Sequence, residues 1–258
     1  MLFRSEEGLE SERKHVNEII ARLEPDNLHA LSYLGKQQFA ERCFVEAQQS
    51  WEQILQRDAA WAEAYFYLGA VQAESTQGDA AVQTFQRALS LSILDGEEGH
   101  GGRTPETRQA AEAQLAATFT AWEHVLTQGT TYTHAQARFQ QARQVMAHRY
   151  VTQGQEKLQR DDAEGAIAHL RWVNALTPMD AVASGMLKQA QTSLTFAEGI
   201  HYYQEQDYVQ ALRCFRETLT LDPDHEKAKR YLRYAQQCPE GGVSERFRHL
   251  DLGDREKS

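Results

Sequence analysis

The chain has 258 residues, more than a typical single compact domain, so we expect either two domains or one extended array of repeats. Its composition is 41% apolar and 25% charged, which is ordinary for a folded protein and excludes collagen-like or low-complexity sequence. The formal net charge of −10 argues against a nucleic-acid scaffold, because phosphate binding requires clustered lysine and arginine.

Cysteine content and apolar runs indicate the cellular setting. Cys43, Cys214 and Cys238 lie far apart and predict neither a disulfide framework nor a zinc site. The first residues, MLFRSEEGLE, hold no apolar run long enough for a signal peptide, and no segment reaches the roughly 18 apolar residues of a membrane span. We therefore expect a cytoplasmic protein without membrane insertion, although a removed leader or a fragment of a longer chain would look the same.

The first predicted helix covers residues 8–25 and reads as the second helix of an incomplete unit. Two full units follow, each with a glycine in its first helix, then an alanine and a large apolar residue four positions apart in its second. These residues are Gly35, Ala47 and Trp51, then Gly69, Ala81 and Phe85, and the two glycines are 34 residues apart. A small residue lets two crossing helix backbones approach while the large residue fills the groove between them.

The middle of the chain fits no repeat step. Residues 92–106, SILDGEEGHGGRTPE, are the most turn-like segment in the body of the chain. A helix then opens at Thr104, Pro105 and Glu106 and runs to about residue 126. It either closes the first half or starts the second. GHGGR at 99–103 lacks the GK[ST] ending of a phosphate-binding loop, so we interpret it as a flexible loop.

The same pattern of glycine, alanine and large apolar residue occurs twice in the second half, with a longer spacing between the two units. It consists of Gly154, Ala166 and Leu170, then Gly199, Ala211 and Phe215, and a proline follows each alanine at Pro178 and Pro223. The glycines are now 45 residues apart, and the excess of 11 residues (45 − 34) is close to three helical turns. The spacing therefore predicts two lengthened helices, at 133–160 and 180–205.

Helix ends and faces in this half follow from local signals. We expect Thr133 with Gln136 to cap the first long helix, and Asp162 and Asp207 to cap the helices that follow them. The inner stripe of the second long helix is predicted at Ala183, Leu187, Ala190, Leu194 and Ala197. The alternative is two short helices broken near 193–195. Residues 224–237 predict a polar capping helix, and 239–258 a disordered tail.

These spacings resemble the tetratricopeptide repeat, with its signature W-x2-L-G-x2-Y, then A-x3-F, then P. The matching stretches are LSYLGKQQ…AQQSW, YFYLGAVQ…AVQTF, YVTQGQEK…AIAHL…P and TFAEGIHY…ALRCF…P, which with their flanks cover most of residues 8–237. Ala59 replaces the first proline, and Gln153 and Glu198 replace the leucine before glycine. The resemblance implies an all-α, right-handed superhelical solenoid of antiparallel helix pairs. Its segments would be repeats at 1–92 (half a unit plus two full units), a loop and connecting helix at 93–132, and repeats with a capping helix at 133–238.

No motif demands catalysis. The ten histidines include no HExxH pair and no histidine–cysteine cluster at metal spacing, and no nucleophile elbow or dinucleotide fingerprint is present. We therefore expect a protein that is not an enzyme and has no cofactor and no metal.

The family resemblance implies a concave groove that holds an extended peptide or a partner helix. The candidate residues are Tyr33, Lys36, Phe39, Phe66, Tyr67, Phe196, Tyr203, Arg230 and Tyr234, and the final helix adds Lys227 and Tyr231. Tyrosine suits binding because it offers apolar area with a polar tip. The alternative is that half of these aromatics pack between helices. A known family variant grips a C-terminal carboxylate, but of the matching positions Ser32, Lys36 and Tyr67 only Lys36 is basic, so that clamp is not expected.

The predicted function is a non-catalytic scaffold or adaptor that binds another protein. A second hypothesis is self-assembly into a homo-oligomer, in which a neighbouring chain covers Val16, Ile19, Ile20 and Leu23 of the incomplete first unit. A third is a regulatory or recruiting part of a larger enzyme complex. Neither nucleic acid nor membrane is expected as a partner.

Overall fold

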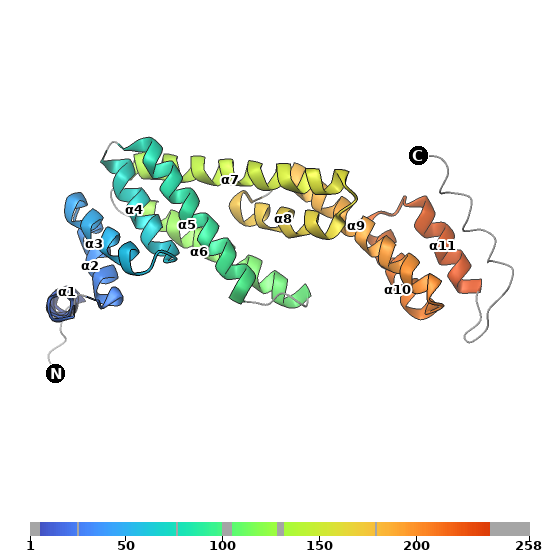
Figure 1. The fold of residues 1–258 in the computed structure, drawn as a ribbon, viewed down its shortest axis with the longest axis horizontal. Coiled ribbons are helices and arrows are strands. Elements are labelled where there is room, and N and C mark those ends of the chain that lie inside the picture. The colour runs from blue at the N-terminus through green and yellow to red at the C-terminus, as the bar shows by residue number, and fades with distance from the viewer. Residues whose placement is uncertain are drawn as a thin grey trace. The chain divides into compact units, whose positions relative to one another are not determined.

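The computed structural model describes residues 6–24, 26–75, 77–99, 105–127, 132–178 and 180–237. All secondary structure in these ranges is α-helical (Figure 1). The helices are α1 (Glu6–Leu23), α2 (Leu28–Ala40), α3 (Phe44–Arg57), α4 (Ala62–Glu74), α5 (Gly78–Gly99), α6 (Pro105–Thr127), α7 (Thr133–Gln159), α8 (Ala163–Leu176), α9 (Ala181–Gln204), α10 (Tyr208–Leu221) and α11 (Glu226–Gln237). The predicted all-α fold of helix pairs is confirmed, and the predicted tail at 239–258 lies outside the described residues.

Contacts divide the chain into two compact units. The first unit comprises Met1–Val151 with Arg171–Asp180, and the second comprises Thr152–Leu170 with Ala181–Ser258. Because the division passes through α7 and α8, each of these helices contributes to both units. The segments that the repeat pattern suggests, 1–92, 93–132 and 133–238, stay a prediction.

Each repeat glycine faces the large apolar residue of its own helix pair. The pairs are Gly35–Trp51, Gly69–Phe85, Gly154–Leu170 and Gly199–Phe215. A Cβ atom added to any of these glycines would lie between 2.5 and 3.0 Å from the nearest atom of the facing side chain. Side chains in a packed interior do not accommodate such an approach without displacement. The steric role predicted for these glycines is therefore confirmed in all four pairs.

Two glycines of α9 provide a matched test of this crossing. We expect Gly199→Ala to destabilise the protein by about 1–2 kcal/mol, because overpacking against the fully buried Phe215 exceeds the gain in helix propensity. Gly185→Ala should instead stabilise it by about 0.5–1 kcal/mol, since nothing lies within 4 Å of the added Cβ. Urea denaturation followed by circular dichroism measures both variants. Equal effects of the two substitutions would contradict the close crossing at Gly199.

The turn inside each helix pair repeats one backbone arrangement. A backbone N–H donates to the carbonyl five residues earlier, at 2.8 to 3.0 Å, from Cys43 to Gln38, Gln77 to Gln72, Asp162 to Lys157 and Asp207 to Tyr202. The preceding residue is left-handed at Arg42 (φ 61°), Asp161 (φ 60°) and Gln206 (φ 66°). This is the Schellman arrangement, which usually places glycine at the left-handed position. Here the turn is formed without glycine, so the sequence carries no glycine signal for it.

The two lengthened helices are confirmed, with 27 residues in α7 and 24 in α9. Because α9 is unbroken, the alternative of a break near 193–195 is wrong. The first half of α9 buries Ala190 against Ala166 and Leu170 of α8, whereas the second half buries Gly199 against α10. Nine residues, about two and a half turns, separate Ala190 from Gly199 and place them on opposite sides of the helix. The predicted inner stripe is therefore wrong at its end, where Ala197 is exposed.

The turn predicted from residue 92 onward is wrong at its start, because α5 continues to Gly99. Phe85, Leu89 and Ile93, four residues apart, are at most 1% exposed, so the buried stripe of the helix extends past residue 92. Buried apolar contacts here outweigh the turn-like composition. Residues 100–104 lie outside the described ranges.

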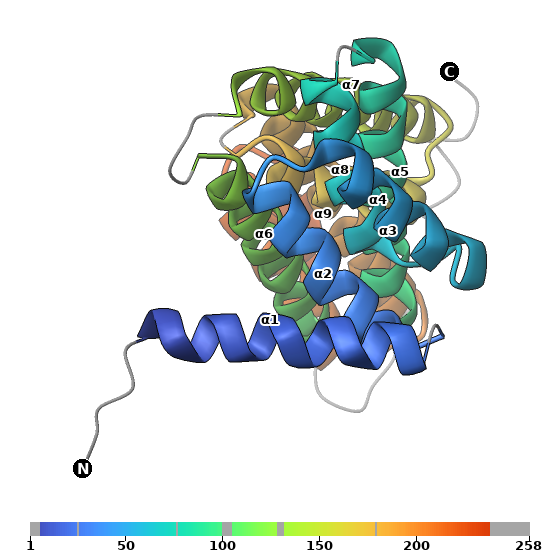
Figure 2. The same cartoon turned by 90° about the vertical axis from the view of Figure 1, so that its left-hand side faces the viewer.

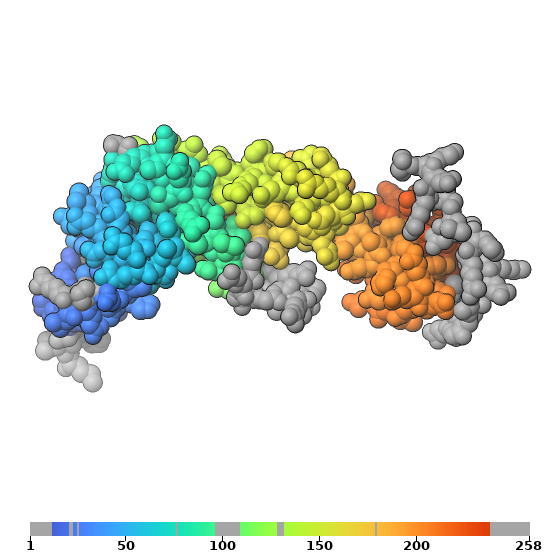
Figure 3. Space-filling model, in the orientation of Figure 1, coloured from blue at the N-terminus to red at the C-terminus, as the bar shows by residue number. Residues whose placement is uncertain are grey.

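The first helix packs on α2 and lies crosswise to it (Figure 2). Three apolar side chains of α1 remain exposed, namely Val16 at 52%, Ile19 at 41% and Leu23 at 76%. In Figure 3 the atoms of α3, α4 and α5 form one continuous surface on the side shown. Within the described residues no helix combines the length and the apolar character that crossing a membrane requires.

Candidate functional site

Three predicted groove residues of the first unit lie in its core. Phe39 is 2% exposed, Phe66 is fully buried and Tyr67 is 7% exposed. Phe66 stacks on Trp122 of α6 with ring centroids 4.7 Å apart and planes 11° apart. Phe39 stacks on Tyr132 at 4.4 Å, and the Tyr132 hydroxyl donates to the Phe39 carbonyl at 3.1 Å. Later segments of the same chain thus cover these side chains.

Tyr67 and Lys36 belong to the same packed region. The Tyr67 ring stacks on Trp51 at 4.8 Å, and burial raises the pKa of its hydroxyl, with Glu63 adding to the shift. Lys36 Nζ lies 2.7 Å from Glu63 Oε1 and 5.8 Å from the centre of the Tyr67 ring. Of the candidates in this unit, only Lys36 and Tyr33 keep partly exposed side chains.

Glu74 fixes the start of α7 in this unit. Its Oε1 accepts from the backbone N–H of Ala135 at 2.9 Å, and its Oε2 lies 3.6 Å from His134 Nδ1. The predicted cap at Thr133 is therefore wrong, because α7 begins at Thr133 and the acceptor comes from α4. Carboxylates are favoured at helix N-termini by the free N–H groups and the helix dipole.

The candidates of the second unit form a partly exposed aromatic surface on α9 and α11. We call it the tyrosine face and define it as Phe196, Tyr203, Arg230, Tyr231 and Tyr234. The ring of Tyr231 meets that of Tyr203 edge to face, with centroids 5.6 Å apart. Its centroid also lies 6.0 Å from that of Phe196 and 6.0 Å from that of Tyr234. The four aromatic side chains are partly exposed and Arg230 is exposed. The structure thus brings three of the candidate residues, Phe196, Tyr203 and Tyr234, together around Tyr231.

Buried neighbours hold this face in place. Phe215 of α10 is fully buried and lies beneath Phe196 and Tyr231. Its ring centroid is 6.0 Å from that of Phe196 and 5.7 Å from that of Tyr231. The predicted N-cap at Asp207 is confirmed, since its carboxylate accepts from Gln210 N at 3.1 Å and begins α10. In α11, Tyr234 comes three residues after Tyr231 and four after Arg230, so it lies on the same side of the helix as each of them.

The N-cap predicted at Asp162 is also confirmed. Asp162 Oδ1 accepts from Gly165 N at 2.8 Å, and Oδ2 accepts from Lys157 Nζ at 2.8 Å. Both hydrogen bonds lower the pKa of the Asp162 carboxyl, and the bond from Lys157 contributes most.

The tyrosine face carries positive charge on its α11 side. Helix α11 holds four basic residues and one acidic residue, in a chain with a net charge of −10. Lys229 Nζ lies 2.9 Å from Glu226 Oε1 and 3.8 Å from Asp224 Oδ1, and the hydrogen bond to Glu226 raises the pKa of the lysine. Lys227, Arg230 and Arg233 are exposed. An acidic segment would therefore be attracted to this side.

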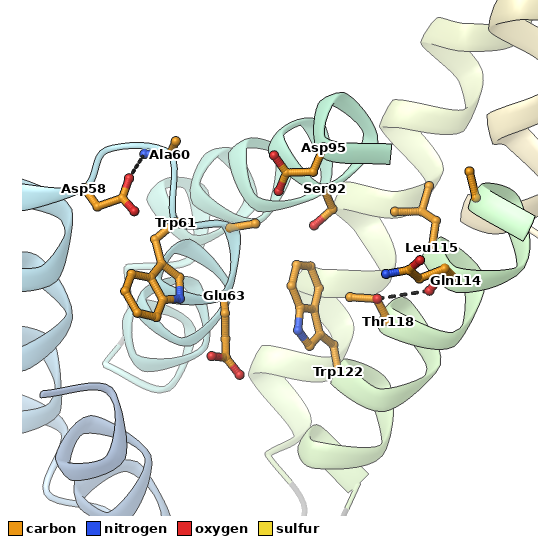
Figure 4. A pocket seen from close by; sticks show the side chains of 12 residues that line it. Asp58, Ala60, Trp61, Glu63, Ser92, Asp95, Gln114, Leu115, Thr118 and Trp122 are labelled. Carbon is orange, nitrogen blue, oxygen red and sulfur yellow. Dashed lines mark hydrogen bonds between the residues drawn. The ribbon is translucent and has the colours of Figure 1, made fainter. Parts of the chain in front are cut away.

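A separate pocket of about 610 Å³ lies in the first unit, among the turn before α4, α5 and α6 (Figure 4). The lining residues are Asp58, Ala60, Trp61, Ala62, Glu63, Ser92, Asp95, Ala111, Gln114, Leu115, Thr118 and Trp122. Asp58 Oδ1 accepts from Ala60 N at 2.9 Å and fixes the turn. No candidate groove residue lines this pocket, and the sequence pattern did not indicate it because α6 fits no repeat step.

Metal and catalytic chemistry have few candidates. Across the parts of the chain that the structure describes, no group of three or more histidine, cysteine, aspartate or glutamate side chains could hold a metal ion. Cys214 is buried, and burial raises the pKa of its thiol, which lowers the fraction of reactive thiolate.

Comparison with protein-family models matches residues 194–225 to the tetratricopeptide repeat family. The match spans the end of α9, all of α10 and the turn before α11. No curated protein matches the chain. Among solved structures, a chain of "Structure of Naa15/Naa10 bound to HypK-THB" is similar to 88% of this chain at 12% identity with a TM-score of 0.27. This chain spans about 37% of the length of that neighbour.

Proposed function

We propose that the tyrosine face binds a peptide or helix of a partner protein. Residues 194–225, which contribute Phe196 and Tyr203 to this face, match the tetratricopeptide repeat family, a helical scaffold of the kind that serves protein interaction. The observation that carries this proposal is the group of four partly exposed aromatic rings, in which Tyr231 contacts the other three and Phe215 lies beneath. Rigid tyrosines provide contact area at low entropic cost.

The partner segment on this surface is acidic with apolar anchors. Exposed Lys227, Arg230 and Arg233 favour carboxylates, while Phe196 and Tyr203 offer apolar area for a side chain. The corresponding surface of the first unit is not available in the same way, since Phe39 and Phe66 are covered by Tyr132 and Trp122. The interaction proposed here is therefore placed in the second unit.

A peptide-display selection tests the proposal on the full chain. We expect the native protein to enrich a recurring acidic and apolar motif, and a double variant Arg230→Ala, Tyr234→Ala to bind it at least about tenfold more weakly. Arg230 is exposed and Tyr234 partly exposed, so the fold should survive both changes. Val209→Ala on α10, where the side chain is 64% exposed, is the matched control.

Two results would count against the tyrosine face. One is the absence of any enriched motif, and the other is a motif that the double variant binds as tightly as the native protein. Weakening of the interaction by added salt is expected as well, because exposed charges are screened.

A second candidate function is self-association through α1. Its exposed Val16, Ile19 and Leu23 lie three and four residues apart and so form one apolar stripe. Ile19→Asp should then lower the average mass measured by light scattering at high protein concentration. A native protein that stays monomeric throughout the concentration range would remove this candidate.

A further inference from the structure

The pocket of the first unit combines aromatic walls with acidic groups. Trp61 ends the turn before α4, Trp122 lies on α6, and Glu63 stands between their two indoles in Figure 4. Asp95 and Ser92 of α5 form the neighbouring edge. This pocket is separate from the tyrosine face, so an inference about it does not rest on the function proposed above.

The charge balance of the pocket is negative. Its lining contains the carboxylates of Asp58, Glu63 and Asp95 and no lysine, arginine or histidine. Lys36 offsets one of these charges, because its Nζ lies 2.7 Å from Glu63 Oε1. The N-terminus of α4, where the Trp61 side chain makes no capping bond, adds about half a positive charge. A net negative charge remains, which favours a cation over an anion.

The two indoles are held rather than free. Trp122 is only 7% exposed, because one face of its ring stacks on Phe66 at 4.7 Å, and a small part of the ring lines the pocket. Trp61 meets His29 at 5.7 Å in an edge-to-face arrangement and remains partly exposed. Indole faces attract cations through their quadrupole, and do so more strongly where water is partly excluded.

A second pocket shows what acidic groups alone provide. It measures about 360 Å³ and is lined by Asp161, Asp162 and Glu164 with small and aliphatic residues of α9 and no aromatic ring. Asp162 there is already bound to Lys157 and Gly165. The second pocket therefore lacks the aromatic wall of the first, and a substitution in it serves as a control for substitutions in the first pocket.

We propose that the pocket lined by Trp61 and Trp122 binds an arginine side chain of a partner polypeptide. A guanidinium is planar, so it stacks on an indole face and donates at the same time to a carboxylate in its own plane. Trp61, which is partly exposed, provides the stacking face; Trp122 forms the opposite wall of the pocket, and Asp95 and Glu63 provide the acceptors. A lysine ammonium meets the charge but not the planar stacking, so it binds more weakly.

The test uses the indole N–H signals of the ¹⁵N-labelled full chain, in which four tryptophans each give one signal. Trp→Phe variants assign them. Nα-acetyl-arginine methylamide should shift the Trp61 and Trp122 signals saturably and leave Trp51 and Trp172, which do not line the pocket, unchanged. The citrulline counterpart, which has nearly the same shape without the charge, should cause no saturable shift. The lysine counterpart should bind less tightly than arginine.

Two variants and a control complete the test. Asp95→Asn and Trp61→Ala should each weaken arginine binding about fivefold or more, whereas Glu164→Gln in the second pocket should leave it unchanged. The absence of a saturable shift at Trp61 and Trp122 would overturn the proposal. Equal binding of citrulline would overturn the role of charge, and equal binding of lysine would overturn the assignment to arginine.

Discussion

Arg143→Met is expected to lower the free energy of unfolding by about 2–5 kcal/mol. Arg143 lies on α7 and is buried, yet its guanidinium donates three hydrogen bonds. Nε donates to the Leu176 carbonyl at 2.7 Å, Nη2 to the Ala175 carbonyl at 3.5 Å, and Nη1 to Glu123 Oε2 at 3.0 Å. A single side chain thereby joins α6, α7 and the last residues of α8.

The cost of the substitution follows from where these acceptors lie. Leu176 ends α8, and the last carbonyls of a helix have no partner within it. Ala175 and Leu176 are both buried, so their carbonyls lose the arginine without gaining water. Methionine fills a similar volume but donates nothing. Glu123 is 38% exposed, so its carboxylate regains hydration and adds less to the cost.

Arg149→Met on the same helix is the matched control. Arg149 is exposed, so we expect its replacement to change the free energy of unfolding by less than about 0.5 kcal/mol. Arg143→Lys should lie between the two, because an ammonium cannot reach three acceptors as a planar fork does. Urea denaturation followed by tryptophan fluorescence compares all three variants. An Arg143→Met protein as stable as Arg149→Met would show that this capping contributes nothing.

The sequence predicted the parts of the fold that local spacing controls. Glycine and its facing large residue lie 16 positions apart in every unit, so one steric requirement leaves a visible pattern, as at Gly199 and Phe215. The aspartate caps and the two long helices were predicted for the same reason. The repeated turns at Arg42, Asp161 and Gln206 left no such trace, because residues other than glycine take the left-handed position.

Contacts between distant segments were the part that could not be predicted. Glu74 replaces the expected cap at Thr133, and it lies 61 residues before the N–H that it accepts from. The grouping of the tyrosine face could be anticipated because the repeat pattern assigns its residues to matching positions of α9 and α11. The pocket lined by Trp61 and Trp122 could not, since it depends on α6, a helix that has no counterpart in the repeat pattern.

Phe66→Ala is expected to destabilise the protein by about 3–5 kcal/mol and so to act on folding rather than directly on a binding surface. Phe66 is fully buried and contacts four other aromatic rings. The centroid distances are 5.1 Å to Tyr67, 5.9 Å to Phe85, 4.7 Å to Trp122 and 5.6 Å to Phe139. Removal of the ring leaves a cavity that rings held on several sides cannot easily close.

Tyr65→Ala, one residue earlier on α4, is the control for this change. Tyr65 is partly exposed, and Arg87 lies over its ring at 6.0 Å, so we expect a loss of only about 1 kcal/mol. Urea denaturation curves of the two variants give the loss in free energy of unfolding for each substitution. Similar small losses would place Phe66 on an accessible surface and return it to the candidates for the groove. A large loss at Phe66 alone means that any weaker peptide binding by Phe66→Ala reports unfolding, so that only the exposed positions of α11 test the proposed interaction directly.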